Sequence, residues 1–231
     1  MPVMKPISNT MNYADTSVIA CATVLEEMLP LMPPDLTFQK LDFGLHADPG
    51  KLRTALQAAI DQTEPHFSTI LLGYGFCSQA AAGLKSDTRT LIIPKVDDCI
   101  AIFLGSDTEY KIQHRIEPGT LYQTKGWIET DKSLKMSPDM INKYGEGRAK
   151  WLLKIMIKNY TRLAFINTGN YDIERYRAES RATASELGLK YEEIAGSNAL
   201  VKKLLWGPWD SEFVIAPPGH ALTFSDFRTE C

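Results

Sequence analysis

The sequence of 231 residues predicts an α/β fold, a Rossmann-like parallel sheet with helices on both faces. The first observation is a series of short runs, such as residues 69–72, that are continuously apolar rather than alternating. Such runs are typical of strands that are buried on both faces of a parallel sheet. The second observation is that these runs alternate with segments of helical periodicity in both halves of the chain. The pattern fits either one extended sheet or two Rossmann-like lobes.

Four strands are predicted in the first half of the chain. The helix after the second strand begins at Pro49, because proline suits the first turn of a helix, and Leu52, Leu56 and Ile60 follow at helical spacing. The predicted strands are residues 17–21, 36–41, 69–72 and 90–93, and the other predicted helices are residues 24–29 and a short segment of small residues at 80–82.

The middle of the chain changes character. Residues 105–150 contain prolines, glycines and aromatic residues with little periodicity, which predicts an insertion of loops and helices. A helix at 151–157 precedes a second strand–helix series, in which Gly188 ends the long helix and Ser197 caps the following one. The predicted strands of this series are residues 162–166, 190–194 and 212–216, and its helices are residues 171–187 and 198–205.

These elements divide the chain into four predicted segments. Residues 1–14 form a flexible N-terminal arm without periodicity. Residues 15–107 form a first α/β unit, residues 108–158 form the insertion, and residues 159–231 form a second α/β unit.

The composition excludes several classes of function. The chain is 44% hydrophobic, as a globular protein with a real core is, and its net charge of −3 attracts neither nucleic acid nor an anionic membrane. No apolar run approaches the ~20 residues of a transmembrane helix, and the N-terminus does not resemble a signal peptide. We therefore expect a soluble, cytoplasmic protein whose cysteines are free thiols.

Three cysteines each follow a predicted strand. Cys21 follows the first, Cys77 the third and Cys99 the fourth, while His46 stands after the second. The carboxyl ends of parallel strands line the ligand crevice of open α/β sheets, so these four residues are predicted to converge as metal ligands. A helix N-terminus would also lower the pKa of a thiol. The alternative is that the cysteines are ordinary core residues, and the chain has no Cys-x-x-Cys pair.

Two aspartates and a tyrosine near these thiols are candidate catalytic residues. Asp97 and Asp98 precede Cys99, and we expect Asp97, Asp98 or Tyr74 to transfer protons. Asp98 fits equally well as the N-cap of a helix that begins near Cys99.

Candidate cofactor-binding residues lie in the glycine-rich turn and in the middle segment. Gly73 and Gly75 could let backbone N–H groups approach an anion, although the turn lacks the third glycine of a dinucleotide motif and any Walker lysine. Trp127, with other aromatic residues of the middle segment, could form the wall of a pocket or could anchor that segment to the core.

Several short motifs together resemble the DUF1638 family of uncharacterised bacterial and archaeal proteins. These motifs are Gly-Tyr-Gly-Phe-Cys at 73–77, Pro-Lys-Val-Asp-Asp-Cys-Ile at 94–100, Phe-Leu-Gly-Ser at 103–106, Pro-Gly-Thr at 118–120 and Gly-Trp at 126–127. The resemblance extends from about Val18 to Phe227 and includes Cys21 and His46. Members of the family often carry histidine at the position of Asp97. The resemblance implies an association with one-carbon metabolism and corrinoid-dependent methyltransferase systems.

The leading hypothesis is a metal-binding enzyme that acts on a small-molecule substrate in one-carbon or methyl-group metabolism. Soft thiolates select zinc or iron, including an iron–sulfur cluster held by three cysteines with one open position. The alternative is a non-catalytic accessory protein that binds a corrinoid through His46, or binds a corrinoid-dependent methyltransferase. A third hypothesis is a metal-free enzyme with Cys77 or Cys99 as nucleophile. The middle segment could also supply a dimer interface.

Overall fold

The structure is a computed structural model that describes residues 13–130 and 138–228. It confirms the α/β class, with parallel strands flanked by helices. The strands form two sheets, one of five strands in the order β2-β1-β3-β4-β8 and one of three in the order β5-β6-β7. The arrangement is therefore two lobes and not one extended sheet. Residues 1–12 of the predicted N-terminal arm lie outside the described residues, and Tyr13–Asp15 form the short 3-10 helix η1.

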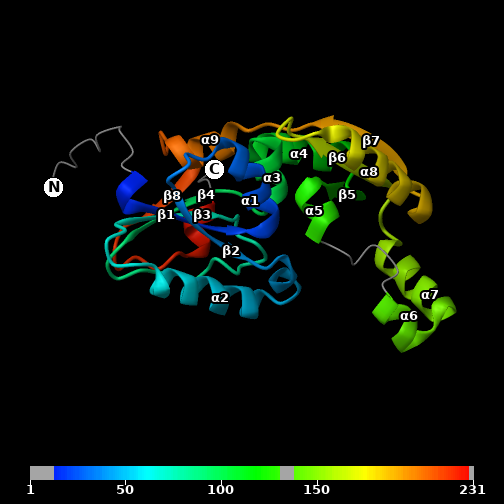
Figure 1. The fold of residues 1–231 in the computed structure, drawn as a ribbon, viewed down its shortest axis with the longest axis horizontal. Coiled ribbons are helices and arrows are strands. Elements are labelled where there is room, and N and C mark those ends of the chain that lie inside the picture. The colour runs from blue at the N-terminus through cyan, green and yellow to red at the C-terminus, as the bar shows by residue number, and fades with distance from the viewer. Residues whose placement is uncertain (1–12, 131–137, 229–231) are drawn as a thin grey trace.

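The first sheet contains the four strands predicted in the first half of the chain. They run parallel, and β8 pairs antiparallel with β4. All residues of β1 are buried, which explains why its sequence is continuously apolar from Val18 to Cys21. Helix α2 lies on one face, and α1, α3 and α9 lie on the other (Figure 1). The elements are β1 (Thr16–Cys21), α1 (Ala22–Met28), η2 (Leu29–Leu31), β2 (Thr37–Leu41), η3 (Phe43–Ala47), α2 (Pro49–Gln62), β3 (Thr69–Gly73), β4 (Thr90–Pro94), α3 (Cys99–Leu104), α9 (Ala199–Trp206), β8 (Phe213–Ala216) and η4 (Phe224–Phe227).

The second sheet is entirely parallel. Helices α5 and α8 pack against each other beside it, and α6 and α7 form a hairpin further along the chain (Figure 1). The elements are α4 (Asp107–Ile116), β5 (Thr120–Gln123), α5 (Lys125–Thr130), α6 (Pro138–Tyr144), α7 (Glu146–Ile157), β6 (Arg162–Asn167), α8 (Ile173–Leu187) and β7 (Lys190–Ala195). Among the described residues, no helix is long and apolar enough to cross a membrane.

The second half of the chain differs from the sequence prediction at two strands. Residues 120–123, within the expected insertion of loops and helices, form β5, a strand too short to produce a visible period. Strand β8, which we expected in the second unit, pairs with β4 of the first sheet and covers its edge. An apolar run does not specify which sheet it joins, so this long-range pairing is not visible in the sequence.

The short helix predicted at residues 80–82 is absent, and the chain turns there instead. The three preceding residues, Cys77, Ser78 and Gln79, have φ angles of +46°, +55° and +70°. This left-handed backbone is unfavourable for residues other than glycine, and it prevents a right-handed helix from starting.

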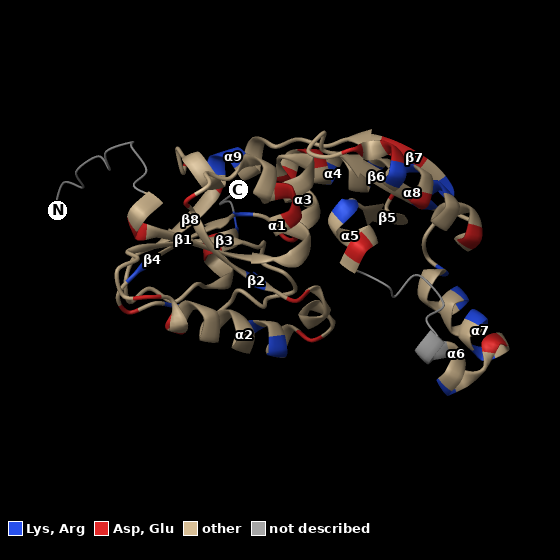
Figure 2. Cartoon of the chain, in the orientation of Figure 1, with Lys and Arg blue, Asp and Glu red and all other residues tan. Residues whose placement is uncertain are grey.

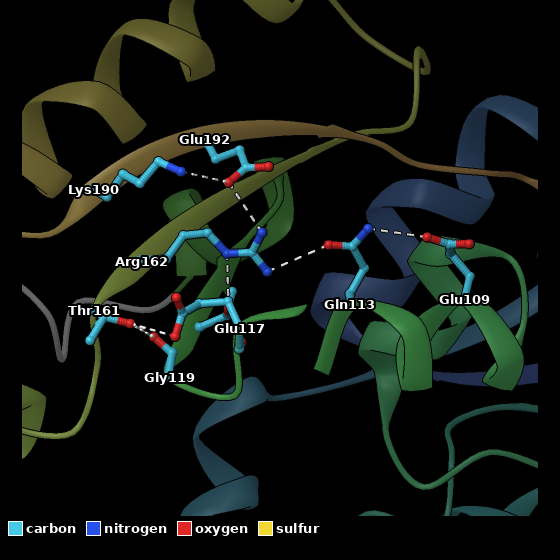
Figure 3. A network of polar contacts seen from close by, with 9 residues as sticks. Glu109, Gln113, Glu117, Gly119, Thr161, Arg162, Lys190 and Glu192 are labelled. Atoms are coloured by element: carbon cyan, nitrogen blue, oxygen red, sulfur yellow. Dashed lines mark hydrogen bonds and ion pairs between the residues drawn. The ribbon is translucent and has the colours of Figure 1, made fainter. Parts of the chain in front are cut away.

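Arg162 ties the second sheet together at the start of β6. Its buried guanidinium donates from Nε to Thr120 Oγ1 at 2.9 Å on β5 and from Nη1 to Glu192 Oε2 at 3.2 Å on β7. It also donates from Nη2 to Gln113 Oε1 of α4 at 3.4 Å (Figure 3). The buried charge thus has partners on both neighbouring strands and on α4.

Glu27 joins the two lobes at the end of α1. Its side chain is fully buried, and Oε2 accepts hydrogen bonds from Thr168 Oγ1 at 2.5 Å and Asn170 Nδ2 at 2.9 Å, both beyond the end of β6. Burial raises the pKa of this carboxyl above its ordinary value of 4.5. Helices α1 and α5 approach closely at the same junction, because a Cβ on Gly126 would lie 2.7 Å from Thr23 Cα.

We expect Glu27→Gln and Glu27→Ala to affect stability in opposite ways at neutral pH. Since the pKa is raised in the folded state, the carboxyl stabilises the fold fully only below its unfolded pKa, and this contribution is lost as pH rises through the folded pKa. Glutamine stays neutral, so Glu27→Gln should gain stability relative to the wild type as pH rises above 4.5. Alanine leaves the partner groups without a hydrogen-bond acceptor, so Glu27→Ala should lower the free energy of unfolding by about 1–3 kcal/mol.

The measurement is urea unfolding at several pH values, with the exposed Glu186→Gln as matched control. An unchanged difference between Glu27→Gln and the wild type from pH 4.5 to 8 would contradict the burial argument.

Candidate functional site

The three predicted cysteines lie at the carboxyl-terminal edge of the first sheet, where its parallel strands end. Cys21 is the last residue of β1, Cys77 follows β3 by four residues, and Cys99 begins α3 just beyond β4. Strands β1, β3 and β4 are neighbours in the sheet and run parallel, so their carboxyl ends meet. All three cysteines are buried and free. The parallel topology thus brings together thiols that are far apart in the sequence.

Tyr74 stands among these thiols. Its pKa is raised by burial first, and further by the charges that Cys21, Cys77 and Cys99 would carry. Burial likewise raises the pKa of Cys77 to about 12 and that of Cys99 well above its usual range. Buried thiols of this kind stay neutral at neutral pH, and a neutral thiol is a poor nucleophile. This counts against the metal-free nucleophile hypothesis.

His46, on η3, presents a free nitrogen at the same edge. Its ring stacks on Tyr74 with centroids 6.0 Å apart, and Nδ1 lies 3.0 Å from the carbonyl oxygen of Phe43. A carbonyl only accepts hydrogen bonds, so the proton is on Nδ1 and Nε2 keeps its lone pair. Burial lowers the pKa of the ring, which keeps it neutral. The geometry therefore fixes the tautomer in which Nε2 can bind a metal ion.

Two polar atoms of this site are buried without a hydrogen-bond partner. They are His46 Nε2 and Tyr74 Oη. Buried polar groups are nearly always hydrogen-bonded, because leaving one unpaired costs free energy. Two unpaired atoms on stacked rings beside three thiols mark this edge as a place where a ligand would be stabilised.

The two aspartates differ in their surroundings. Asp98 Oδ1 accepts from Ile100 N at 2.8 Å and caps α3, as the alternative interpretation of the sequence predicted. Burial raises the pKa of Asp98, and the Tyr110 hydroxyl donates a hydrogen bond to it. Asp97 is exposed, and its carbonyl oxygen accepts from Cys77 N at 2.8 Å. Asp98 is thus the aspartate that adjoins the buried thiols of Cys77 and Cys99.

The left-handed turn at 77–79 belongs to this site. Hydrogen bonds from Phe76 N to Val96 O and from Cys77 N to Asp97 O, both 2.8 Å, hold the β3 loop against the β4 loop. A Cβ on Gly75 would lie 2.8 Å from Val96 O, so only glycine permits this approach. Strained backbone of this kind is concentrated at functional sites. The sequence carries no signal for it, since none of the three residues is glycine.

The remaining predicted residues pack around the site. A Cβ on Gly73 would lie 2.7 Å from Ala20 Cβ, so the glycine is explained by packing against β1. Trp127, on α5, makes edge-to-face contacts with Phe43 at 6.2 Å and Phe103 at 5.6 Å. Phe43 stacks in turn on His46 at 5.3 Å. An aromatic row therefore connects the second lobe to the candidate ligand nitrogen.

The side chains of the candidate metal ligands do not point toward a common metal position. Within residues 13–130 and 138–228, no three His, Cys, Asp or Glu side chains form a group that could hold a metal ion as they stand. Binding at this edge would require the thiol side chains to turn toward a common point. The sequence interpretation also missed Glu27, whose only signal is an acidic residue within the apolar helix α1.

Comparison with known proteins places the chain in a family. The family model described as a protein of unknown function, DUF1638, matches residues 40–205, which include His46, Cys77 and Cys99. No curated protein and no solved structure matches the chain. The matched segment covers well over half of the 231 residues and contains the motifs that first pointed to this relationship. The chain therefore belongs to the DUF1638 family.

Proposed function

We propose that this protein is a metal-binding enzyme in which Cys21, Cys77 and Cys99 hold a zinc ion, an iron ion or an iron–sulfur cluster. His46 serves as the fourth ligand, or lies beside an open position. The observation that carries the proposal is the buried, unpartnered Nε2 of His46, with its lone pair fixed by the Nδ1 hydrogen bond, at the carboxyl-terminal edge of the sheet where three free cysteines also lie.

The chemistry of the donor set supports a soft or borderline metal. Thiolate and imidazole ligands suit zinc and iron, and three thiolates with one open position suit an iron–sulfur cluster. A bound cation would also favour the thiolate forms that burial otherwise disfavours. Because the thiols do not form a ready chelate, we expect their side chains to reorient when a metal binds.

Other residues of the site would act on the substrate. A metal ion with an open coordination position would supply Lewis-acid chemistry. The Tyr74 hydroxyl, neutral and without a partner, could donate a hydrogen bond to a bound small molecule. Asp98 could hold or release a proton beside Cys99. The family resemblance favours a substrate from one-carbon or methyl-group metabolism.

The second candidate function is that of an accessory protein that binds a corrinoid through His46. The free Nε2 supports this candidate too, because a corrinoid is often ligated through histidine. That nitrogen is buried, however, and a small ion reaches a buried atom more easily than a macrocycle does. We therefore rank the metal site first.

We expect Cys21→Ser, Cys77→Ser and Cys99→Ser each to lose most of the bound metal. Removing one ligand weakens a metal site strongly, and even outer partners of a site are worth about 10–100-fold in affinity. The measurement is elemental analysis with an absorption spectrum on protein purified without oxygen. Cys231→Ser is the matched control and should keep the wild-type metal content. A metal content per chain equal to that of the wild type in all three single variants would refute the proposal.

We expect His46→Ala to lower the metal content or to change the absorption spectrum, because Nε2 would no longer be available as a ligand. The exposed His66→Ala is the matched control. Each variant is also mixed with cobalamin. A cobalamin spectrum that shifts with the wild type and with Cys77→Ser, but not with His46→Ala, would favour the accessory protein over the metal enzyme.

A further inference from the structure

Helices α6 and α7 form a hairpin that is set apart from both sheets (Figure 1). The two helices pack on each other. Residue 145 connects α6 to α7, and residues 158–161 connect α7 to β6. We call residues 138–160 the arm, which is a different segment from the N-terminal residues 1–14. Its position leaves the outer face of α7 uncovered.

The sequence of α7 is typical of a helix that is buried on more than one side. Seven of the nine residues from 149 to 157 are apolar, yet only Ala149 and Ile157 are buried. Trp151 is 56% exposed, Met156 50% and Ile155 42%. Helices that are apolar on most sides are normally buried, and contiguous exposed apolar surface marks an interaction site.

This exposed surface is concentrated on the arm. Twelve large hydrophobic side chains of the described residues are exposed, and five of them lie between residues 144 and 160. Tyr144 and Tyr160 stand at the two ends of this stretch. Aromatic residues and methionine are the types enriched at the centres of protein interfaces.

The arm is basic, whereas the rest of the chain is acidic. Residues 138–160 contain five basic and two acidic residues, a net charge of +3, and the whole chain carries −3, which leaves −6 for the remainder. Figure 2 shows Lys and Arg gathered along α7. Among the described residues, Lys154 and Lys158 form no ion pair.

We propose that the arm binds a second copy of this chain. The apolar face of α7 would be covered by the acidic body of the partner, and the partner's arm would do the same in return. This reciprocal exchange gives a closed two-fold dimer, the commonest form of homo-oligomer. The −6 charge of the remainder opposes binding to nucleic acid or to an anionic membrane, whereas it attracts the arm of an identical chain.

The first test is the mass in solution by light scattering after gel filtration. We expect twice the mass of the chain for the wild type and for the matched control Phe38→Glu, which replaces a similarly exposed apolar residue on β2 of the first sheet. Trp151→Glu and Met156→Glu should each weaken dimerisation by about tenfold or more. Circular dichroism checks that the variants remain folded. A wild type that is monomeric at ~100 µM (a concentration at which even a micromolar complex is assembled), or a dimer unaffected by both substitutions, would overturn the proposal.

A second test needs no variant. A zero-length carbodiimide cross-linker joins amines to carboxylates in contact, and the cross-linked dimer is then digested and sequenced by mass spectrometry. We expect intermolecular links from Lys154 or Lys158 to acidic residues outside the arm, and fewer of them at high salt because ionic strength screens the attraction. Links from arm to arm only, or cross-links confined to the monomer, would contradict the exchange of arms.

Discussion

The carboxyl group of Glu27 lies fully buried at the junction of the two lobes, where Thr168 and Asn170 donate hydrogen bonds to it. Glu27 stands near the end of α1, the short helix that follows β1, and its partners follow β6 of the second sheet. A buried acid needs hydrogen-bond donors, and both donors to Oε2 come from the second lobe, so the first lobe depends on the second at this point. The other oxygen, Oε1, is buried without a hydrogen-bond partner among the described residues. The close approach of Gly126 to Thr23 completes the same junction.

The junction also arranges the candidate site, because α1 belongs to both. Cys21 precedes the first turn of α1 and Glu27 lies in its last, so anchoring one end of this helix holds the other against the sheet edge. From the second lobe, Trp127 reaches Phe43 and thereby His46. The thiols come from the first sheet alone, whereas the aromatic wall that encloses the imidazole comes partly from the second. Both lobes therefore contribute to the candidate site.

Much of the first lobe could be predicted because its signals are local. Strands β1, β3 and β4 are continuously apolar, Pro49 begins α2, and Asp98 caps α3. A parallel sheet then places Cys21, Cys77 and Cys99 at one edge without further information, since all parallel strands end on the same side. The parts that could not be predicted depend on distant contacts. Strand β8 returns to β4, and the turn at residues 77–79 adopts a conformation that its residue types do not favour.

The sequence by itself determined the fold class, most of the strands, the family and the residue types that could bind a metal, because apolar periodicity, caps and short motifs are properties of neighbouring residues. Only the tertiary structure decided how the strands divide into two sheets, which nitrogen of His46 is free, that Glu27 is buried, and that α7 is left uncovered. The division into sheets, the burial of Glu27 and the exposure of α7 depend on groups far apart along the chain, and the free energy of such contacts is not contained in any local pattern. The free nitrogen of His46 depends on a contact within η3, from Nδ1 to the carbonyl oxygen of Phe43, whose geometry the residue types alone do not specify.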